Sequence, residues 1–305
     1  MTIEFDGLNY ETGWRNDPAA VAATIAQDRI VSMSQAAPLK QWDGKTTINL
    51  GRYMDKVHGR GTWTLNQGSC GSCVAFGAAI SIDTLLAIDH VENGATYPGR
   101  TDPMTIYGGS RVQIGGGKVW GQGSVGAWAA KWLKDYGVLL QKKYPGTDLT
   151  TYNANVCCSK FGRGGCPPAL FPEARLHPIK AYAQAKTKAD VANGIANGYP
   201  VTVASEQGFT STRDSRGCAK PSGSWPHQMA IIGIRETDAL VVNSWGNDWI
   251  SGPLVDDQPP GSFWTDWGTI ESMLKAGDSF VLSGVNGWKS KSLNFLRLNW
   301  EQVES

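Results

Sequence analysis

The sequence has little charge, and neither sign is in excess. Charged residues make up 18% of the 305 residues, and the formal net charge is +1. Nucleic acids and anionic membranes select strongly basic surfaces, so this balanced pattern gives no reason to expect either partner. Long apolar runs are also scarce, because no stretch approaches the ~20 apolar residues that span a bilayer. Residues 1–14 lack the basic and apolar regions of a secretory signal, which favours a cytoplasmic location.

Cysteine is infrequent, and its spacing fits no common metal site. The six cysteines are Cys70, Cys73, Cys157, Cys158, Cys166 and Cys218. Their even number allows three disulfides, but reducing conditions are the better expectation without a secretory signal. Cys157, Cys158 and Cys166, with His177 further on, could hold zinc, or Cys166 could bridge to Cys157 or Cys158. Because the spacing differs from a CxxC pair, we expect free thiols, no metal and no cofactor.

Glycine and tryptophan are frequent, with 37 and 13 copies, which indicates a compact and loop-rich fold. Asp17 and Pro18 predict the start of a helix that continues to residue 31. From Cys73 to residue 90 the chain is apolar nearly all round, which is typical of a buried helix. A further helix is predicted over residues 126–140, with Gly137 near its end.

The second half of the chain changes character. Residues 199–205, 228–234 and 239–245 are rich in Val and Ile and predict strands. A helical first half and a strand-rich second half predict an α+β fold of two lobes with a cleft between them. We expect a helical lobe at about residues 68–150 and an antiparallel, β-barrel-like lobe at about residues 175–285. Within this scheme residues 1–45 form an arm or support, residues 46–285 the main domain and residues 286–305 a tail.

Cys73 has the setting of a nucleophile. A free cysteine has a pKa of about 8.5, and both the positive end of a helix and a nearby imidazolium lower it. His227, one of only four histidines, precedes the predicted strand 228–234, and Asn243 lies at the end of the next strand. The Asn243 amide could accept the imidazole N–H and hold the ring in a useful orientation. The alternative for Cys73 is a small buried apolar residue.

Acyl transfer also needs donors placed in advance for the oxyanion. The backbone N–H of Cys73, at a helix start, is one such donor. Gln67, six residues earlier in the same loop, could supply its side-chain amide as another. A polar residue in a glycine-rich loop is otherwise unremarkable, so Gln67 alone would not indicate a function.

Three motifs resemble those of the papain and cathepsin family of cysteine peptidases. NQGSCGSCVAF, around Cys73, resembles the family's nucleophile signature. PHQMAIIGI and NSWGNDW resemble its histidine strand and its asparagine–tryptophan motif, and GQGSVGAWAAKWLKDYGV is similar to the segment that contacts the substrate backbone. The order Gln, Cys, His, Asn is that of the family, and the chain resembles a divergent bacterial or phage-type member.

The resemblance implies a papain-like two-lobe fold and a peptidase that acts on polypeptides. Cys73 would attack the carbonyl and form an acyl-thioester, with His227 as general base and then general acid. Asn243 would orient His227, and Trp245 would shield that hydrogen bond from water. The remaining implied roles are oxyanion binding by Gln67 and the Cys73 N–H, and a place for Gly123 in the wall of the substrate cleft.

The sequence departs from the family pattern at several positions. Val74 stands where the family has Trp or Tyr, and Ile250 where it has Gly. Cys70 matches a cysteine that is normally bridged, yet residues 92–126 contain no cysteine to receive it, and Cys218 has no evident partner either. Residues 1–45 are also short for a family propeptide. These departures leave open whether the cleft is accessible.

Three other uses of the same fold therefore remain. The chain could be a pseudoenzyme whose triad is formed but closed to substrate. It could be a structural or assembly protein, and a virion-associated component of a phage or bacterial particle would fit. An acyltransferase that uses the same thioester is the third alternative, although no feature of the sequence speaks to it.

Overall fold

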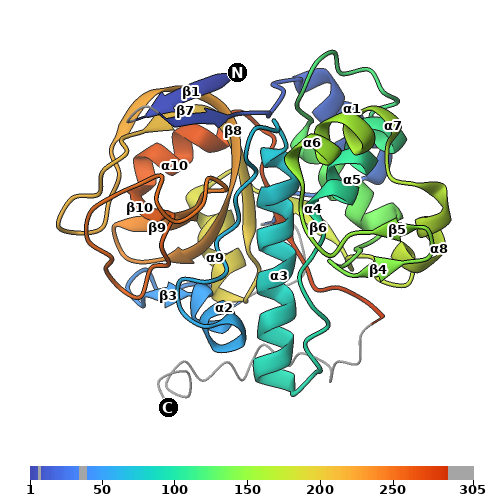
Figure 1. Cartoon of the computed structure of the whole chain (residues 1–305). Coiled ribbons are helices and arrows are strands. Elements are labelled where there is room, and N and C mark those ends of the chain that lie inside the picture. Colours follow the sequence, from blue (N-terminus) through green and yellow to red (C-terminus); the bar gives the residue numbers. More distant parts are fainter. Residues whose placement is uncertain (6–7, 34–39, 288–305) are drawn as a thin grey trace.

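The computed structural model describes residues 1–5, 8–33 and 40–287 of the chain. Helix α3 (Cys73–Asn93) lies at the centre, with the β-sheet on one side and most of the helices on the other (Figure 1). The structure therefore confirms the α+β, two-lobe architecture and the start of the central helix at Cys73.

The sheet of the β lobe is antiparallel throughout. Its strand order is β10-β9-β8-β7-β11-β6, and β3 pairs with β8 beside this path. The strands are β3 (Ile48–Asn49), β6 (Tyr182–Gln184), β7 (Val201–Phe209), β8 (Pro221–Ile234), β9 (Asp238–Val242), β10 (Ser262–Asp266) and β11 (Phe280–Leu282). Within the described residues β10 and β6 end this order, so the sheet is not a closed barrel, but Trp264 of β10 bridges Cys218 in the loop between β7 and β8, which makes the lobe barrel-like as predicted.

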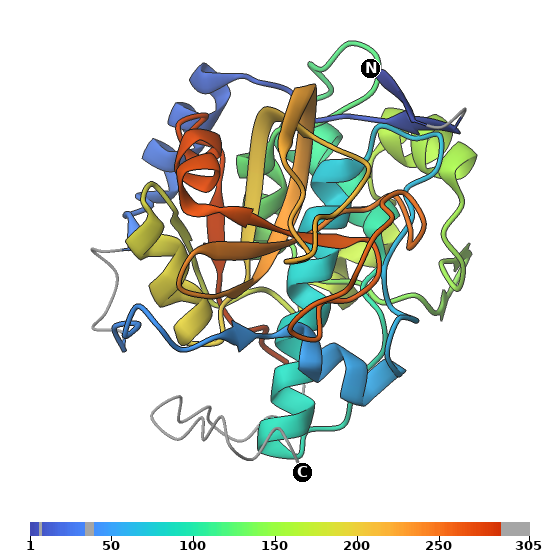
Figure 2. The same cartoon turned by 90° about the vertical axis from the view of Figure 1, so that its left-hand side faces the viewer.

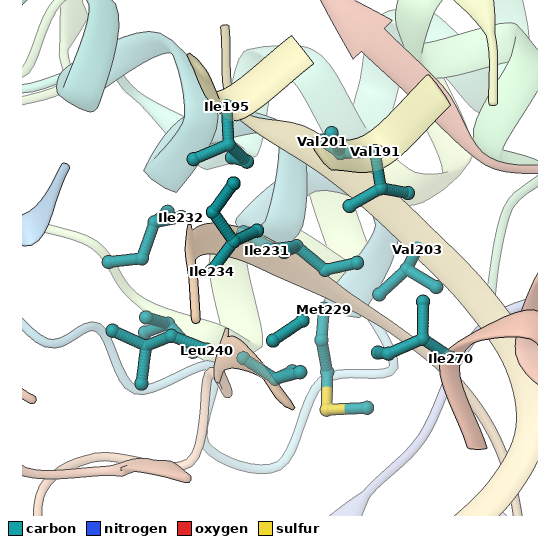
Figure 3. Packing of buried hydrophobic residues seen from close by; sticks show 14 of the residues in the cluster. Val191, Ile195, Val201, Val203, Met229, Ile231, Ile232, Ile234, Leu240 and Ile270 are labelled. Carbon is teal, nitrogen blue, oxygen red and sulfur yellow. The ribbon is translucent and has the colours of Figure 1, made fainter. Parts of the chain in front are cut away.

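Branched apolar side chains explain why these segments form the sheet. Residues 229–234 of β8 are buried at every position, because α3 covers one face and other elements cover the opposite one. Helices α9 (Lys188–Ala196) and α10 (Trp267–Leu274) pack against the sheet (Figure 2). Val191 and Ile270, from these two helices, meet Val203 and Met229 of the sheet in one core cluster (Figure 3).

Helix α3 is buried along most of its length, as its sequence predicted. Every residue from Cys73 to Ile88 is buried. At Gly77 the backbone of β8 comes close, since a Cβ there would lie 3.0 Å from the Met229 carbonyl oxygen. Contrary to the expectation from sequence, α3 is long and apolar enough to cross a membrane. Because 83% of its most apolar stretch is buried inside the fold, it serves here as a core helix.

The helical lobe is built from short elements around α5. They are α4 (Pro103–Gly108), α5 (Gly126–Asp135), α6 (Ala154–Val156), α7 (Gly162–Gly164), α8 (Phe171–Ala174), the π-helical segments Gly109–Ile114 and Cys157–Phe161, the 3-10 turn Pro168–Leu170, and the strand pair β4 (Lys143–Tyr144) and β5 (Thr147–Asp148). The glycine-rich sequence before α5 thus contains helix α4, which Asp102 caps by accepting a hydrogen bond from the Thr105 N–H.

A disulfide joins Cys70 to Cys158, with Cα atoms 5.7 Å apart. The expectation that Cys70 lacks a partner and that Cys158 is a free thiol was therefore wrong. The partner lies 88 residues away along the chain, and only the packing of the Cys157–Phe161 segment brings it beside the nucleophile loop. Because Cys158 is bridged, it is not available as a thiolate ligand for zinc. Cys157, Cys166 and Cys218 are free and buried.

The N-terminal part of the chain crosses from the β lobe to the helical lobe. It contains a hairpin of β1 (Thr2–Phe5) and β2 (Leu8–Glu11), helix α1 (Pro18–Asp28) and, further on, α2 (Gly51–His58). Between β2 and α1 the backbone passes over the start of α3 (Figure 1). We call residues 11–16 the covering segment. The predicted tail lies, from residue 288 on, outside the described residues.

Candidate active site

Strand β8 places His227 beside Cys73. The backbone N–H of Gln228 points at the Cys73 sulfur, and the Gln228 side chain donates a hydrogen bond to the Val74 carbonyl at 3.0 Å. Gln228 and its neighbour His227 therefore lie where β8 packs against α3. The structure thus brings together two residues that are 154 positions apart in the sequence.

Asn243 holds the imidazole of His227. The His227 Nε2 and the Asn243 Oδ1 are 2.7 Å apart, and the same Oδ1 accepts the Ser244 N–H at 2.7 Å. Since this oxygen can only accept, Nε2 carries the proton of the neutral ring. Nδ1 then has a free lone pair, and within the part of the chain that the structure describes it has no hydrogen-bond partner. The ring is oriented to receive a proton at Nδ1.

Trp245 covers this pair. Its ring centroid lies 4.7 Å from that of His227, and Trp225 and Trp249 pack around it at 4.9 and 5.4 Å. Trp245 itself is buried. This aromatic cluster keeps water away from the His227–Asn243 hydrogen bond, which strengthens it in the low local dielectric.

Gln67 lies in the same buried network. Its Oε1 accepts a hydrogen bond from the Ser244 hydroxyl at 2.6 Å, which fixes the orientation of the amide. Its Nε2 donates to the carbonyl oxygens of Glu11 and Cys70, both at 2.9 Å. The Gln67 amide therefore already binds a carbonyl oxygen of the covering segment. A substrate oxyanion would need a donor of this kind.

The covering segment lies directly on Cys73. The Gly13 N–H points at the sulfur, and Trp14 donates its backbone N–H to the Pro226 carbonyl at 3.0 Å. The backbone N–H of Ser124 donates to the Gly13 carbonyl, and the Ser124 carbonyl accepts the Arg15 N–H, both at 2.8 Å. This is the hydrogen-bond pattern of a parallel β-bridge. The segment is thus bonded to both lobes, and the Cys73 side chain has no solvent exposure.

Two glycines allow this close approach. A Cβ at Gly13 would lie 1.9 Å from the Gly71 carbonyl oxygen, and one at Gly123 would lie 2.5 Å from the Gly13 carbonyl oxygen. Gly123 therefore lies directly against the covering segment. The neighbouring Ser124, which forms the backbone hydrogen bonds, was not recognised from sequence.

The electrostatics of the covered site differ from the expectation for an activated thiol. Burial raises the pKa of Cys73 to about 11, although the N–H groups of Gln228, Gly13 and Val74 act in the opposite direction. Burial also lowers the pKa of His227 to about 4, although the hydrogen bond that its Nε2–H donates to Asn243 acts in the opposite direction. Both shifts favour neutral groups, because the covering segment removes the water that would solvate a thiolate and an imidazolium. The predicted thiolate is therefore not the stable form in this state.

The covering segment also buries a tryptophan that sequence reasoning missed. Trp14 is 2% exposed, and its indole Nε1 donates to Asp278 Oδ2 at 2.7 Å. Trp14 and Asp278 are 264 residues apart, so no local pattern could have paired them. Within residues 1–5, 8–33 and 40–287, no group of three His, Cys, Asp or Glu side chains is placed to hold a metal ion.

Comparison with known proteins identifies the same family by two routes, a family match and a related sequence. Residues 54–253 match the family described as papain family cysteine protease. Papain from Carica papaya is 26% identical over 207 residues, which is 66% of this chain and 53% of papain, so the match spans about half the length of that relative.

Solved structures share the fold. Xylellain, a cysteine protease from Xylella fastidiosa, has a TM-score of 0.55 at 16% identity and covers 90% of this chain, with 92% of its own chain matched. The ragweed pollen allergen Amb a 11 cysteine protease, in its proform, has a TM-score of 0.52 at 16% identity, with 89% of this chain and 76% of that one matched. These likenesses support the two-lobed papain fold.

Proposed function

Because the chain belongs to the papain family of cysteine proteases, we propose that it hydrolyses peptide bonds with Cys73 as the nucleophile. The observation that carries the proposal is the His227–Asn243 hydrogen bond of 2.7 Å. It leaves Nδ1 of the buried imidazole without a partner among the described residues, and Gln228, the next residue in β8, contacts Cys73. A structural histidine would instead have both ring nitrogens satisfied.

In the proposed reaction His227 Nδ1 takes the proton from the Cys73 thiol, and the sulfur attacks the substrate carbonyl carbon. The carbonyl electron pair moves to oxygen, where the Cys73 N–H and the Gln67 amide stabilise it. When the C–N bond breaks, His227 returns the proton to the leaving amine and an acyl-thioester remains. Water, deprotonated by His227, then hydrolyses the thioester and frees Cys73. Asn243 orients the ring throughout, and Trp245 excludes water from its hydrogen bond.

We propose further that the covering segment restrains this activity. A substrate must replace Gly13 at the sulfur and the Glu11 carbonyl at the Gln67 amide. It must also take over the backbone groups of Ser124 that bind the segment. Displacement of the segment readmits water, which favours the charged thiolate–imidazolium pair again.

One observation favours the alternative of a pseudoenzyme or assembly protein. Cys73, His227, Asn243 and Gln67 are all fully buried, so the covered molecule offers no access to the triad. In that alternative the segment never leaves, and the fold serves only as a building block. The Cys70–Cys158 bridge bears on location, since disulfides persist mainly in oxidising surroundings. The disulfide therefore favours a location outside the cytoplasm, and the surface of a particle is compatible with this.

Peptide hydrolysis by full-length variants tests the proposal. In a Trp14→Ala background, which weakens the covering segment, we expect hydrolysis of an unstructured polypeptide that Cys73→Ala abolishes. Cys218→Ala is the matched control, because Cys218 is another buried free cysteine and lies next to Arg235, away from the triad. Equal activity of the two cysteine variants would contradict the proposal. Absence of hydrolysis in the folded Trp14→Ala chain would favour the pseudoenzyme.

A further inference from the structure

The loop that precedes α5 binds the covering segment through its backbone. Ser124 forms hydrogen bonds with Gly13 and Arg15, and Gly123 lies directly against Gly13. A peptide substrate that replaces the covering segment would meet the same backbone groups. The shape of residues 119–123, which we call the clamped loop, therefore matters for substrate binding as well as for closure.

The sequence of the clamped loop does not make it rigid. Gly121 and Gly123 have φ angles of 71° and 107°, in the left-handed region that glycine adopts readily. Glycine loses more conformational freedom on ordering than any other residue. An ordered loop with glycine at both positions therefore depends on contacts from outside the loop.

Arg111 supplies such contacts at every second carbonyl of the clamped loop. Its Nη2 donates to the carbonyl oxygens of Val119 at 3.3 Å and Gly121 at 2.6 Å, and its Nη1 donates to that of Gly123. Its Nε donates to the Gly162 carbonyl at 2.9 Å. One guanidinium group thus joins the loop to helix α7.

Arg15 of the covering segment binds the carbonyls in between. Its Nε donates to the Gln122 carbonyl at 2.7 Å, and its Nη2 donates to the same oxygen and to the Trp120 carbonyl at 3.2 Å. The clamped loop therefore lies between two guanidinium groups, and one of them belongs to a segment that substrate must displace. When the covering segment leaves, Arg15 leaves with it, and Arg111 remains on the loop.

Arg111 is itself fixed in position. Its side chain is buried, and its guanidinium carbon lies 5.2 Å from the centre of the Tyr107 ring. The Tyr107 hydroxyl accepts the Gly123 N–H at 2.9 Å, so the two side chains hold both the N–H and the carbonyl of Gly123. A buried charge of this kind is stable only when its donors are satisfied, and the four carbonyl oxygens fulfil that need.

We propose, on the basis of the peptidase function proposed above, that Arg111 is a positioning residue for peptide binding. It keeps the clamped loop ordered after the covering segment has left, so that the Ser124 backbone is placed to pair with the substrate. Without Arg111, binding of a peptide must also order the glycine-containing loop, which weakens binding. The chemistry at Cys73 stays the same, so the effect falls on KM and not on kcat.

Kinetics in the full-length Trp14→Ala background test this role. A peptide with several residues before the scissile bond is compared with p-nitrophenyl acetate, which can acylate Cys73 but is too short to reach Ser124. We expect Arg111→Met to raise KM for the peptide about tenfold or more, while kcat and the rate with p-nitrophenyl acetate change less than about twofold. Arg163→Met is the matched control, because Arg163 is exposed in the neighbouring helix α7.

A fall of equal size with both substrates, or equal KM values for the two arginine variants, would overturn the proposal. Arg111→Lys covers the case in which Arg111→Met does not fold. It keeps the buried charge, but a single ammonium group cannot reproduce the fork of a guanidinium. We expect Arg111→Lys to raise KM in the same way, and a KM equal to that of the Trp14→Ala parent would also overturn the proposal.

Alkylation of Cys73 tests the same hold on the loop without any need for hydrolysis. With Trp14 present, Ser124 binds the covering segment, so loosening the clamped loop should expose the sulfur more often. We expect iodoacetamide to modify Cys73 about tenfold faster in Arg111→Met than in Arg163→Met. Equal rates would overturn the proposal. Faster alkylation of Arg111→Met, with no hydrolysis of any peptide by the Trp14→Ala chain, would instead refute the peptidase function and keep the hold of Arg111 on the loop.

Discussion

Trp14→Ala should expose the nucleophile. In the structure the indole is 2% exposed and donates to the buried Asp278 carboxylate. Truncation of a buried tryptophan to alanine costs about 3–5 kcal/mol. The three backbone hydrogen bonds of residues 13–15 to Ser124 and Pro226 remain and contribute about 0.5–1.5 kcal/mol each. The Glu11 carbonyl also accepts hydrogen bonds from Gln67 and Trp245, so Trp14 supplies the largest single contribution to the docking of the covering segment but not the whole of it.

At about 1.4 kcal/mol per factor of ten, loss of the Trp14 side chain should raise the open population about 100-fold to 1,000-fold. The assay is alkylation of the full-length protein by iodoacetamide, with the Cys73-containing peptide quantified by mass spectrometry. Release of the covering segment also lowers the pKa of Cys73 from about 11, because water then reaches the sulfur. The lower pKa further increases the rate of alkylation at pH 8.

Trp120→Ala is the matched control for this experiment. The substitution is chemically identical, but the Trp120 side chain is 95% exposed, so the covering segment should stay docked. The reasoning is refuted if folded Trp14→Ala protein is alkylated at Cys73 no faster than Trp120→Ala. It is also refuted if the wild-type protein reacts at Cys73 as fast as an exposed thiol.

Three further predictions concern stability and catalysis. Cys158→Ala, which removes the bridge to Cys70, should lower the free energy of unfolding in urea by about 2–4 kcal/mol; an unchanged midpoint would argue against the disulfide. Between about pH 6.5 and pH 4 the wild-type protein should lose about 3 kcal/mol more stability than His227→Gln, because unfolded histidine binds a proton that His227, with its pKa of about 4, does not. The comparison with His227→Gln is needed because burial raises the pKa of Asp278 to about 6, so that protonation of this carboxyl group stabilises the fold over the same range. Equal pH dependence of the two proteins would assign the slope to other groups. Asn243→Ala, in the Trp14→Ala background, should lower kcat about tenfold or more with little change in KM, whereas an unchanged kcat would deny Asn243 an orienting role.

The elements that carry the triad could be predicted from sequence because their signals are local. The all-round apolar run after Cys73 predicted a buried helix, and Cys73 is the first residue of α3. The Val- and Ile-rich segments beside His227 and Asn243 predicted β8 and β9. Cys73 begins α3 and Asn243 follows β9, so the predicted elements placed both residues. His227 lies midway along β8, which begins at Pro221, before the predicted strand.

The features that cover the site could not be predicted in this way. The pairs Trp14–Asp278 and Cys70–Cys158 join segments that are 264 and 88 residues apart. The hydrophobic periodicity of one segment does not identify such a distant partner. The protonation states of Cys73 and His227 likewise depend on tertiary packing, because burial is the main cause of both pKa shifts. A helix start and a nearby imidazole predicted a lowered pKa for Cys73, but burial under Gly13 outweighs both and raises it.

The most direct test of the central claim is to trap the acyl-enzyme. The Trp14→Ala chain is mixed with an activated ester of an N-acylated amino acid, quenched in acid within one turnover and digested for mass spectrometry. We predict one acyl group per molecule, on the Cys73 peptide, and none in the corresponding Cys73→Ala chain. Release of product without an acyl group on Cys73, or with the acyl group on another residue, would contradict the assignment of Cys73 as the nucleophile.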